Sequence, residues 1–156
     1  MGIAKLKPAA KLAMNGAVVA SGTLPSYAYV SVKYAEEVIH RIRVTGAIDL
    51  ERRLPLYRET LANNPSSNYF CVLDNSEGYE NEFSYPDMAV LDRLLVEAGI
   101  KHFYGVTVTK DPGYRNLVKL ASDHAKLLNL EGDLFATDDL AEAERFIMES
   151  IDSLAR

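Results

Sequence analysis

The chain has 156 residues, 48% of them hydrophobic and 25% charged, and its formal net charge at pH 7 is −5. This length suits one domain with a substantial core, and the composition excludes a chain that is disordered throughout. The charge is uneven, because residues 1–25 hold Lys5, Lys7 and Lys11 without any acidic residue and leave −8 on residues 26–156. So acidic a body repels phosphate backbones, which argues against nucleic-acid binding.

The cysteine count and the hydropathy of the chain indicate the cellular compartment that we expect for the protein. Cys71 is the only cysteine, so no intramolecular disulfide or cysteine-rich metal site can form, as expected in a reducing cytoplasm. No apolar run approaches the roughly 18 residues of a membrane span. We expect residues 1–25 to be an N-terminal extension whose lysines form a solvated tail, and residues 26–156 to form the domain.

A β-hairpin is the first predicted element. Residues 27–34 are rich in aromatic and β-branched residues, and residues 38–44 place apolar side chains on one face and arginines on the other. Both runs are short enough to be strands. We therefore expect them to pair antiparallel across a turn near residues 35–37.

A helix and a central strand follow the hairpin. Apolar residues recur every three or four positions over residues 50–61, and Asp49 stands in front of them as a helix cap. Pro55 removes one backbone hydrogen bond, so we expect an irregular first turn or a helix that starts near Leu54. Residues 69–73 form an almost continuous apolar run, which predicts an interior strand covered on both faces.

Helices and strands alternate through the rest of the chain. They are a helix between Ser84 and Gly99, a strand at 103–108, a helix at 111–128, a strand at 133–136 and a helix at 140–154. This order predicts a single α/β domain with a mixed, mostly parallel five-stranded sheet and four helices.

No known catalytic or cofactor motif occurs in the chain. The glycines form no phosphate-binding loop, and His40, His102 and His124 lack the spacing of metal ligands, so we expect them to be packed or surface histidines. Cys71 falls within the central strand, where a buried and inert thiol is expected. The sequence therefore predicts no enzyme, no cofactor and no metal site.

Asp74 is the acidic residue best placed for a ligand, because it ends the central strand, where open α/β sheets bind ligands. A receiver-like phosphoaspartate site would combine it with Thr109 and Lys110 after the next strand. Receivers also carry a pair of acidic residues after the first strand, and Thr45-Gly-Ala47 supplies none. The receiver interpretation is therefore the weaker one.

Three short motifs occur in the order of a known fold. They are Gly46-Ala-Ile-Asp49 followed by Pro55, Val72-Leu-Asp74, and Leu134-Phe-Ala-Thr-Asp-Asp-Leu-Ala-Glu-Ala143. Over residues 27–151 the chain resembles a STAS domain of the SpoIIAA-like, anti-sigma-factor-antagonist type. The resemblance implies a cytoplasmic, bacterial regulatory module that binds a kinase-like protein partner or associates with itself. Family members are switched by phosphorylation of a serine where the helix after the central strand begins; their Asp-Ser-Ser/Thr-Gly signature is missing here, and Ser84 is the nearest equivalent.

The predicted binding surface is the segment from Asn75 to Met88, in which aromatic residues alternate with glutamates. Aromatic side chains anchor protein interfaces, and carboxylates select a basic or neutral partner. In an alternative, the same rings line the pocket of a small-molecule or lipid carrier similar to the CRAL-TRIO fold. A third hypothesis is an enzyme of unrecognised type. In a purely structural interpretation, Phe83 and Tyr85 only pack the helix entry onto the core, and Ser84 only caps the helix. The predicted surface residues are Asp74, Ser76, Tyr79, Phe83, Ser84 and Tyr85, with Ser84 also the candidate phosphoacceptor.

Overall fold

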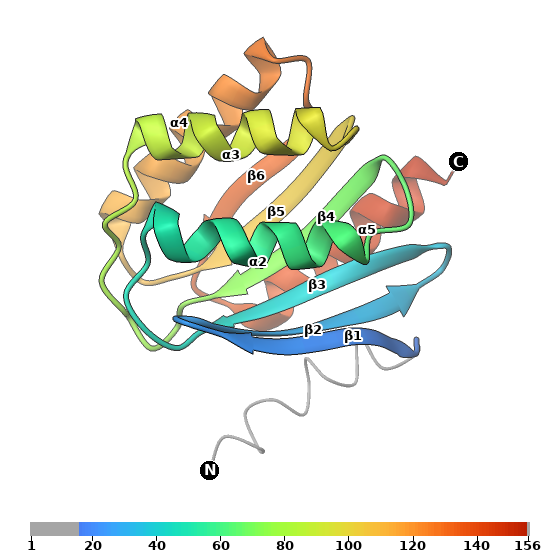
Figure 1. The fold of residues 1–156 in the computed structure, drawn as a ribbon, viewed down its shortest axis with the longest axis horizontal. Coiled ribbons are helices and arrows are strands. Elements are labelled where there is room, and N and C mark those ends of the chain that lie inside the picture. The colour runs from blue at the N-terminus through green and yellow to red at the C-terminus, as the bar shows by residue number, and fades with distance from the viewer. Residues whose placement is uncertain (1–15, 156) are drawn as a thin grey trace.

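The structure, a computed structural model that describes residues 16–155, is a six-stranded mixed sheet with helices on both faces (Figure 1). Lys5, Lys7 and Lys11 lie outside the described residues. The strands occupy the sheet in chain order; β1 to β3 are antiparallel neighbours, and β3 to β6 are parallel neighbours. The elements are β1 (Val18–Leu24), β2 (Tyr27–Tyr34), β3 (Glu37–Val44), α2 (Leu50–Ala62), β4 (Asn68–Asp74), α3 (Tyr85–Glu97), β5 (His102–Val108), α4 (Pro112–Leu127), β6 (Glu131–Thr137) and α5 (Leu140–Leu154).

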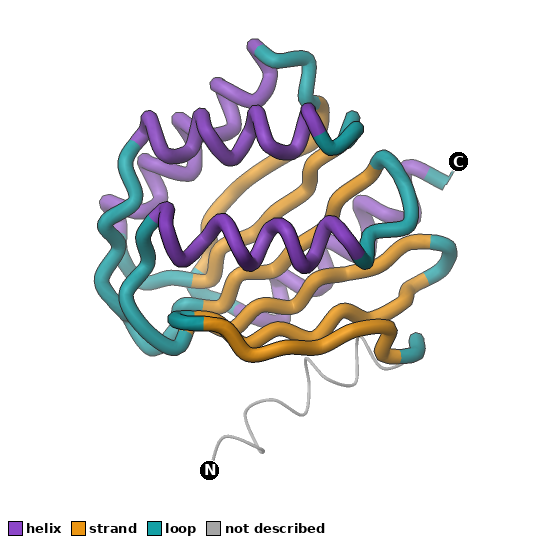
Figure 2. Tube along the Cα trace, viewed as in Figure 1, coloured by secondary structure: helices purple, strands orange, loops and turns teal. Residues whose placement is uncertain are grey.

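The parallel strands decide where the helices lie. Each crossover from β3 to β6 steps one strand in the same direction, and right-handed crossovers in one direction place their helices on one face. Helices α2, α3 and α4 therefore share a face, and α5 covers the other after the last strand (Figures 1 and 2). The sheet has one hydrophobic core on each face, and β4 contributes to both. Its residues Tyr69, Cys71 and Leu73 face α2 and α3. Phe70 and Val72 point to the opposite face and pack against α5.

The hairpin and the interior strand are confirmed, and the strand count is wrong. Tyr27 pairs with Val44 across β2 and β3, and β4 lies between β3 and β5 with Cys71 buried. The sheet has six strands because Val18–Leu24, within the predicted extension, pairs with β2 as an edge strand. Gly22 leaves room for the ring of Tyr29, since a Cβ there would lie 2.8 Å from that ring.

Helix α2 does not start near Leu54, which was one of the two expectations based on Pro55. Asp49 caps it, as predicted, with its carboxylate accepting from the N–H of Arg52 at 2.8 Å. The helix starts at Leu50 and contains Pro55. The carbonyl that Pro55 leaves without its usual donor belongs to Glu51, an exposed residue that water can reach, so the helix continues through the proline.

His40 is a buried polar residue that joins the hairpin to the end of α2. Its Nδ1 lies 2.7 Å from the hydroxyl of Ser31, its Nε2 lies 3.0 Å from the side-chain carbonyl of Asn64, and its ring stacks on Tyr69. Burial lowers the pKa of His40 to about 4, while the hydrogen bond to Asn64 acts in the opposite direction. His40 is therefore neutral in the folded protein near pH 7.

Candidate functional site

A groove lies at the carboxyl ends of β4 and β5, where open α/β sheets commonly bind ligands. It has a volume of about 450 Å³ and runs between the β4–α3 loop, residues 75–84, and the β5–α4 loop. Ser76 and Tyr79 line it from the first loop, and Thr109 and Lys110 line it from the second. This hollow, which we call the loop groove, brings together two of the predicted surface residues.

Hydrogen bonds fix the β4–α3 loop in one conformation. The Asn75 side chain accepts from the N–H of Tyr79 at 2.9 Å and donates to the carbonyl of Tyr79 at 3.0 Å. From the other flank, the N–H of Ile48 donates to the carbonyl of Glu80 at 2.9 Å, and the carbonyl of Ile48 accepts from Glu82 at 2.8 Å. The loop is thus held by its backbone, while Tyr79 and the two glutamates stay exposed.

Ser84 caps α3, as the sequence predicts. Its hydroxyl accepts from the N–H of Asp87 at 3.3 Å, and the carboxylate of Asp87 accepts from the N–H of Ser84 at 3.0 Å. This reciprocal pair satisfies two backbone donors at the start of the helix. The residue is exposed at the helix N-terminus. Its capping role is confirmed, and its role as a phosphoacceptor stays a prediction.

The three aromatic residues of the predicted surface have different environments. Phe83 is only 5% exposed, and its ring lies 5.0 Å from the guanidinium carbon of Arg53. Tyr79 and Tyr85 are 37% and 41% exposed, and Tyr85 meets the ring of His124 edge-on. Phe83 therefore packs the entry of α3 onto the core, and the exposed aromatic surface consists of the two tyrosines. The three rings do not share the loop groove, which only Tyr79 lines.

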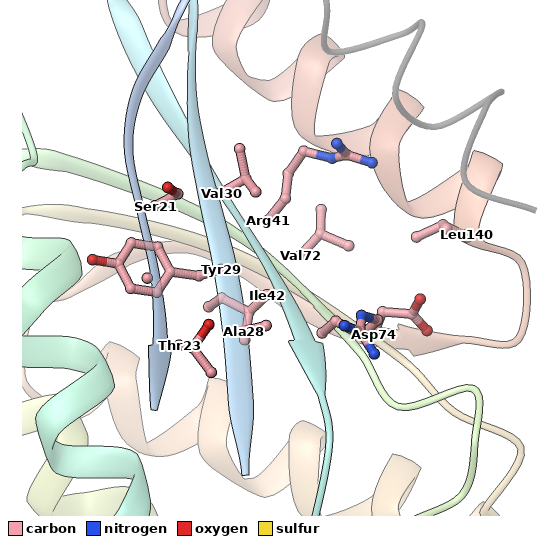
Figure 3. Close-up of a pocket in the computed structure, with 12 residues that line it drawn as sticks. Ser21, Thr23, Ala28, Tyr29, Val30, Arg41, Ile42, Val72, Asp74 and Leu140 are labelled. Atoms are coloured by element: carbon pink, nitrogen blue, oxygen red, sulfur yellow. The ribbon is translucent and has the colours of Figure 1, made fainter. Parts of the chain in front are cut away.

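Asp74 lines a second hollow beside α5 (Figure 3), and its carboxylate accepts a hydrogen bond at 3.0 Å from the N–H of Ser76, which lines the loop groove. This hollow has a volume of about 460 Å³. It is lined by residues of strands β1 to β4 and by Leu140 at the start of α5. Arg41 points from β3 toward α5 (Figure 3). Its Nε donates to the carboxylate of Glu144 in α5 at 2.8 Å. Burial raises the pKa of Glu144, and Arg41 opposes this rise. Of the residues of the receiver-like set, Thr109 and Lys110 line the loop groove, and Asp74 lines the second hollow.

A third hollow, enclosed by α2, α3, α4 and the sheet, contains a buried arginine that the sequence analysis missed. Arg53 is 6% exposed, and its guanidinium carbon lies 5.6 Å from the ring of Tyr57 and 5.0 Å from that of Phe83. The Nε and Nη1 atoms of Arg53 are buried without a hydrogen-bond partner, as are the hydroxyls of Tyr27 and Tyr114. Burial raises the pKa of Tyr27 and of Tyr57, so these phenols are neutral beside a charged guanidinium.

The histidines serve separate structural contacts. His102 lies 2.8 Å from the side chain of Asn68, and His124 lies 2.8 Å from the carboxylate of Asp92 between α4 and α3. Within residues 16–155, no three His, Cys, Asp or Glu side chains are grouped closely enough to hold a metal ion. In the same part of the chain, no helix has the length and apolar character needed to cross a membrane.

Comparison with known proteins identifies the fold. The structure is similar to that of a protein of uncharacterised function from Shewanella loihica PV-4, of the DUF3478 family with a SpoIIAA-like fold. The two share 14% sequence identity with a TM-score of 0.50, over 82% of this chain and 98% of that chain. No protein-family model matches the sequence, and no curated protein is significantly similar to it. The predicted SpoIIAA-like α/β fold is therefore confirmed, with six strands in place of five.

Proposed function

We propose that the protein is a non-enzymatic regulatory module that binds a protein partner through the β4–α3 loop and the start of α3. The carrying observation is a loop fixed by backbone hydrogen bonds whose large side chains remain in solvent. A loop that is ordered before binding loses less conformational entropy when a partner docks. The proposed interaction surface consists of Ser76, Glu77, Tyr79, Glu80, Glu82, Ser84 and Tyr85.

The exposed tyrosines favour a protein partner. Tyr79 and Tyr85 expose more than a third of their area, although rings of this size contribute more stability when covered. Tyrosine is enriched at interface hot spots, since it offers a large area at low entropic cost. The neighbouring Glu77, Glu80 and Glu82 would favour a partner with a basic or neutral face.

Ser84 supplies the proposed switch. A phosphate on this residue would sit at the N-terminus of α3, where the helix dipole stabilises negative charge. It would also add charge to a surface that already carries three glutamates. Phosphorylation would therefore change partner affinity while the helix stays folded.

Site-specific photo-crosslinking in cells that naturally produce the protein tests the proposal. A photoreactive phenylalanine replaces Tyr79. The matched control carries it in place of Leu127, the last residue of α4, which is 79% exposed. We expect a discrete adduct of defined mass from position 79 and none from position 127. No adduct at position 79, or the same adducts at both positions, would contradict the proposal.

A further inference from the structure

We infer that the hollow around Arg53, which we call the Arg53 cavity, binds a small monocarboxylate whose oxygens accept hydrogen bonds from the guanidinium. This site lies inside the domain, between the sheet and helices α2, α3 and α4. Its anchor, Arg53, is buried and is not part of the proposed interaction surface, and its test uses the protein without a partner, so either proposal can fail without the other.

The first argument is the uncompensated charge of Arg53. Buried arginines are normally paired with a carboxylate, because removing a charged guanidinium from water is unfavourable unless an opposite charge compensates it. Among residues 16–155, the ion pairs within 4.0 Å do not include Arg53. Its tyrosine neighbours carry no charge to offset it, because burial raises the pKa of Tyr27 and of Tyr57. An anion from solution would supply the missing charge.

The second argument is the direction of the free donors. The rings of Tyr57 and Phe83 attract the guanidinium by cation–π contacts. Burial acts to lower the pKa of Arg53, but the neighbouring phenols of Tyr57, Tyr114 and Tyr27 raise it, so the guanidinium stays charged. The N–H groups lie in the guanidinium plane, and Nε and Nη1 are buried without a hydrogen-bond partner. A carboxylate matches this planar arrangement, since its two oxygens can accept two parallel N–H bonds. The unpartnered hydroxyl of Tyr114, which lines the same cavity, is a further donor.

The size and lining of the cavity define the ligand. Its volume is about 40 Å³. Since one water needs roughly 10–15 Å³ on this measure, there is room for about three or four heavy atoms, as in formate or acetate. Met88 and Val106 give the cavity apolar walls that suit a methyl group. The acidic group on the wall, Asp92, is already paired with His124 at 2.8 Å.

Tyr114 connects this cavity with the surface. Its side chain lines both the Arg53 cavity and the loop groove, although it is itself only 2% exposed. A carboxylate entering from the groove would therefore pass this ring.

Titration of the full chain with sodium formate and sodium acetate tests the inference. The readouts are the ¹⁵Nε–¹Hε resonance of Arg53 and the thermal midpoint, with ionic strength held constant by gluconate, a carboxylate too large for the cavity. The Kd of a ligand of three or four heavy atoms has a lower limit between roughly half a millimolar and tens of micromolar, and a typical ligand of this size binds more weakly, so titration extends to tens of millimolar. We expect a saturable shift of the resonance and a saturable rise of the midpoint. Acetamide, which has the shape of acetate without its charge, should produce neither.

Two variants make the test specific. Arg53→Met should weaken acetate binding by at least about tenfold, because it removes the charge and the donors but keeps an unbranched side chain. Arg52→Met is the matched control, since Arg52 lies on the exposed side of α2 and pairs with Asp49 at 2.7 Å. It should bind acetate like the parent.

Three results would overturn the inference. They are an equal effect of acetamide and acetate, an equal rise of the midpoint in the parent and in Arg53→Met, and no saturable shift of the Arg53 resonance with either carboxylate. If Arg53→Met does not fold, the resonance titration of the parent decides alone.

Discussion

Acidification should destabilise the protein through His40. The pKa of this buried histidine is about 4 in the folded state, against an ordinary value of 6.5. Between these values the unfolded chain binds a proton that the folded chain does not, so unfolding is favoured as the pH falls. The contribution of His40 is thus complete above about pH 6.5, decreases toward pH 4 and levels off below it.

The size of the effect follows from the two pKa values. Linkage of a pKa of 6.5 in the unfolded chain to one of about 4 in the folded chain gives a loss of about 2 kcal/mol between pH 8 and pH 5. The groups in contact with His40 are Ser31, Asn64 and Tyr69, of which none is charged in this range. Asp92 and Glu144, whose pKa values burial raises, are left unchanged by substitution at position 40.

Urea unfolding, followed by circular dichroism at both pH values, measures this loss. The parent is compared with His40→Gln, which keeps a polar amide but cannot titrate, and with His102→Gln, which leaves His40 in place. The parent and His102→Gln should lose about 2 kcal/mol more than His40→Gln on acidification. An equal loss in all three proteins, or an NMR titration of His40 centred near pH 6.5, would refute the reasoning.

Three further predictions concern the loop, the cap and the thiol. Phe83→Ala should cost about 3–5 kcal/mol of stability, because the ring is buried, whereas Tyr79→Ala should leave the thermal midpoint near that of the parent and weaken partner binding; equal midpoints for the two variants would place Phe83 outside the core. Ser84→Ala should cost about 1 kcal/mol through loss of the α3 cap, measured by urea unfolding against exposed Ser76→Ala as control; no difference between them would show that the cap is dispensable. Cys71, whose thiol pKa burial raises to about 12, should react with a thiol reagent only at the rate of unfolding; rapid labelling of the native protein would contradict its placement in β4.

The place of β4 in the parallel half of the sheet could be predicted because this strand is apolar on both faces. The run from Tyr69 to Leu73 has no polar side, so it had to lie inside a sheet covered by helices above and below. Edge strand β1 carries no such signal. It contains Ser21, Gly22 and Thr23 and has no fully buried residue, so its composition resembles that of a loop.

The candidate site could be predicted only in part. The alternation of aromatic residues and glutamates in the loop indicated the exposed tyrosines. The Ser84 cap could be predicted because capping depends on local sequence. The face on which Asp74 lies could not be predicted, because alternation along β4 fixes the relative faces of its residues and not which helix covers each.

The Arg53 cavity left a weaker signal in the sequence. Arg53 precedes Tyr57 by four residues, which places both on one helix face. The predicted apolar stripe ran through Leu50, Leu54, Tyr57 and Leu61 and did not include Arg53. Its three leucines are only half-buried.

Binding to the partner captured by crosslinking tests the central claim most directly. Isothermal titration calorimetry compares the parent with the double variant Tyr79→Ala/Tyr85→Ala and with Leu127→Ala as a matched exposed control. If the β4–α3 loop and the start of α3 form the interaction surface, the double variant should bind at least about tenfold more weakly at an unchanged thermal midpoint, and Leu127→Ala should bind like the parent. Equal affinity of the parent and the double variant would contradict the account.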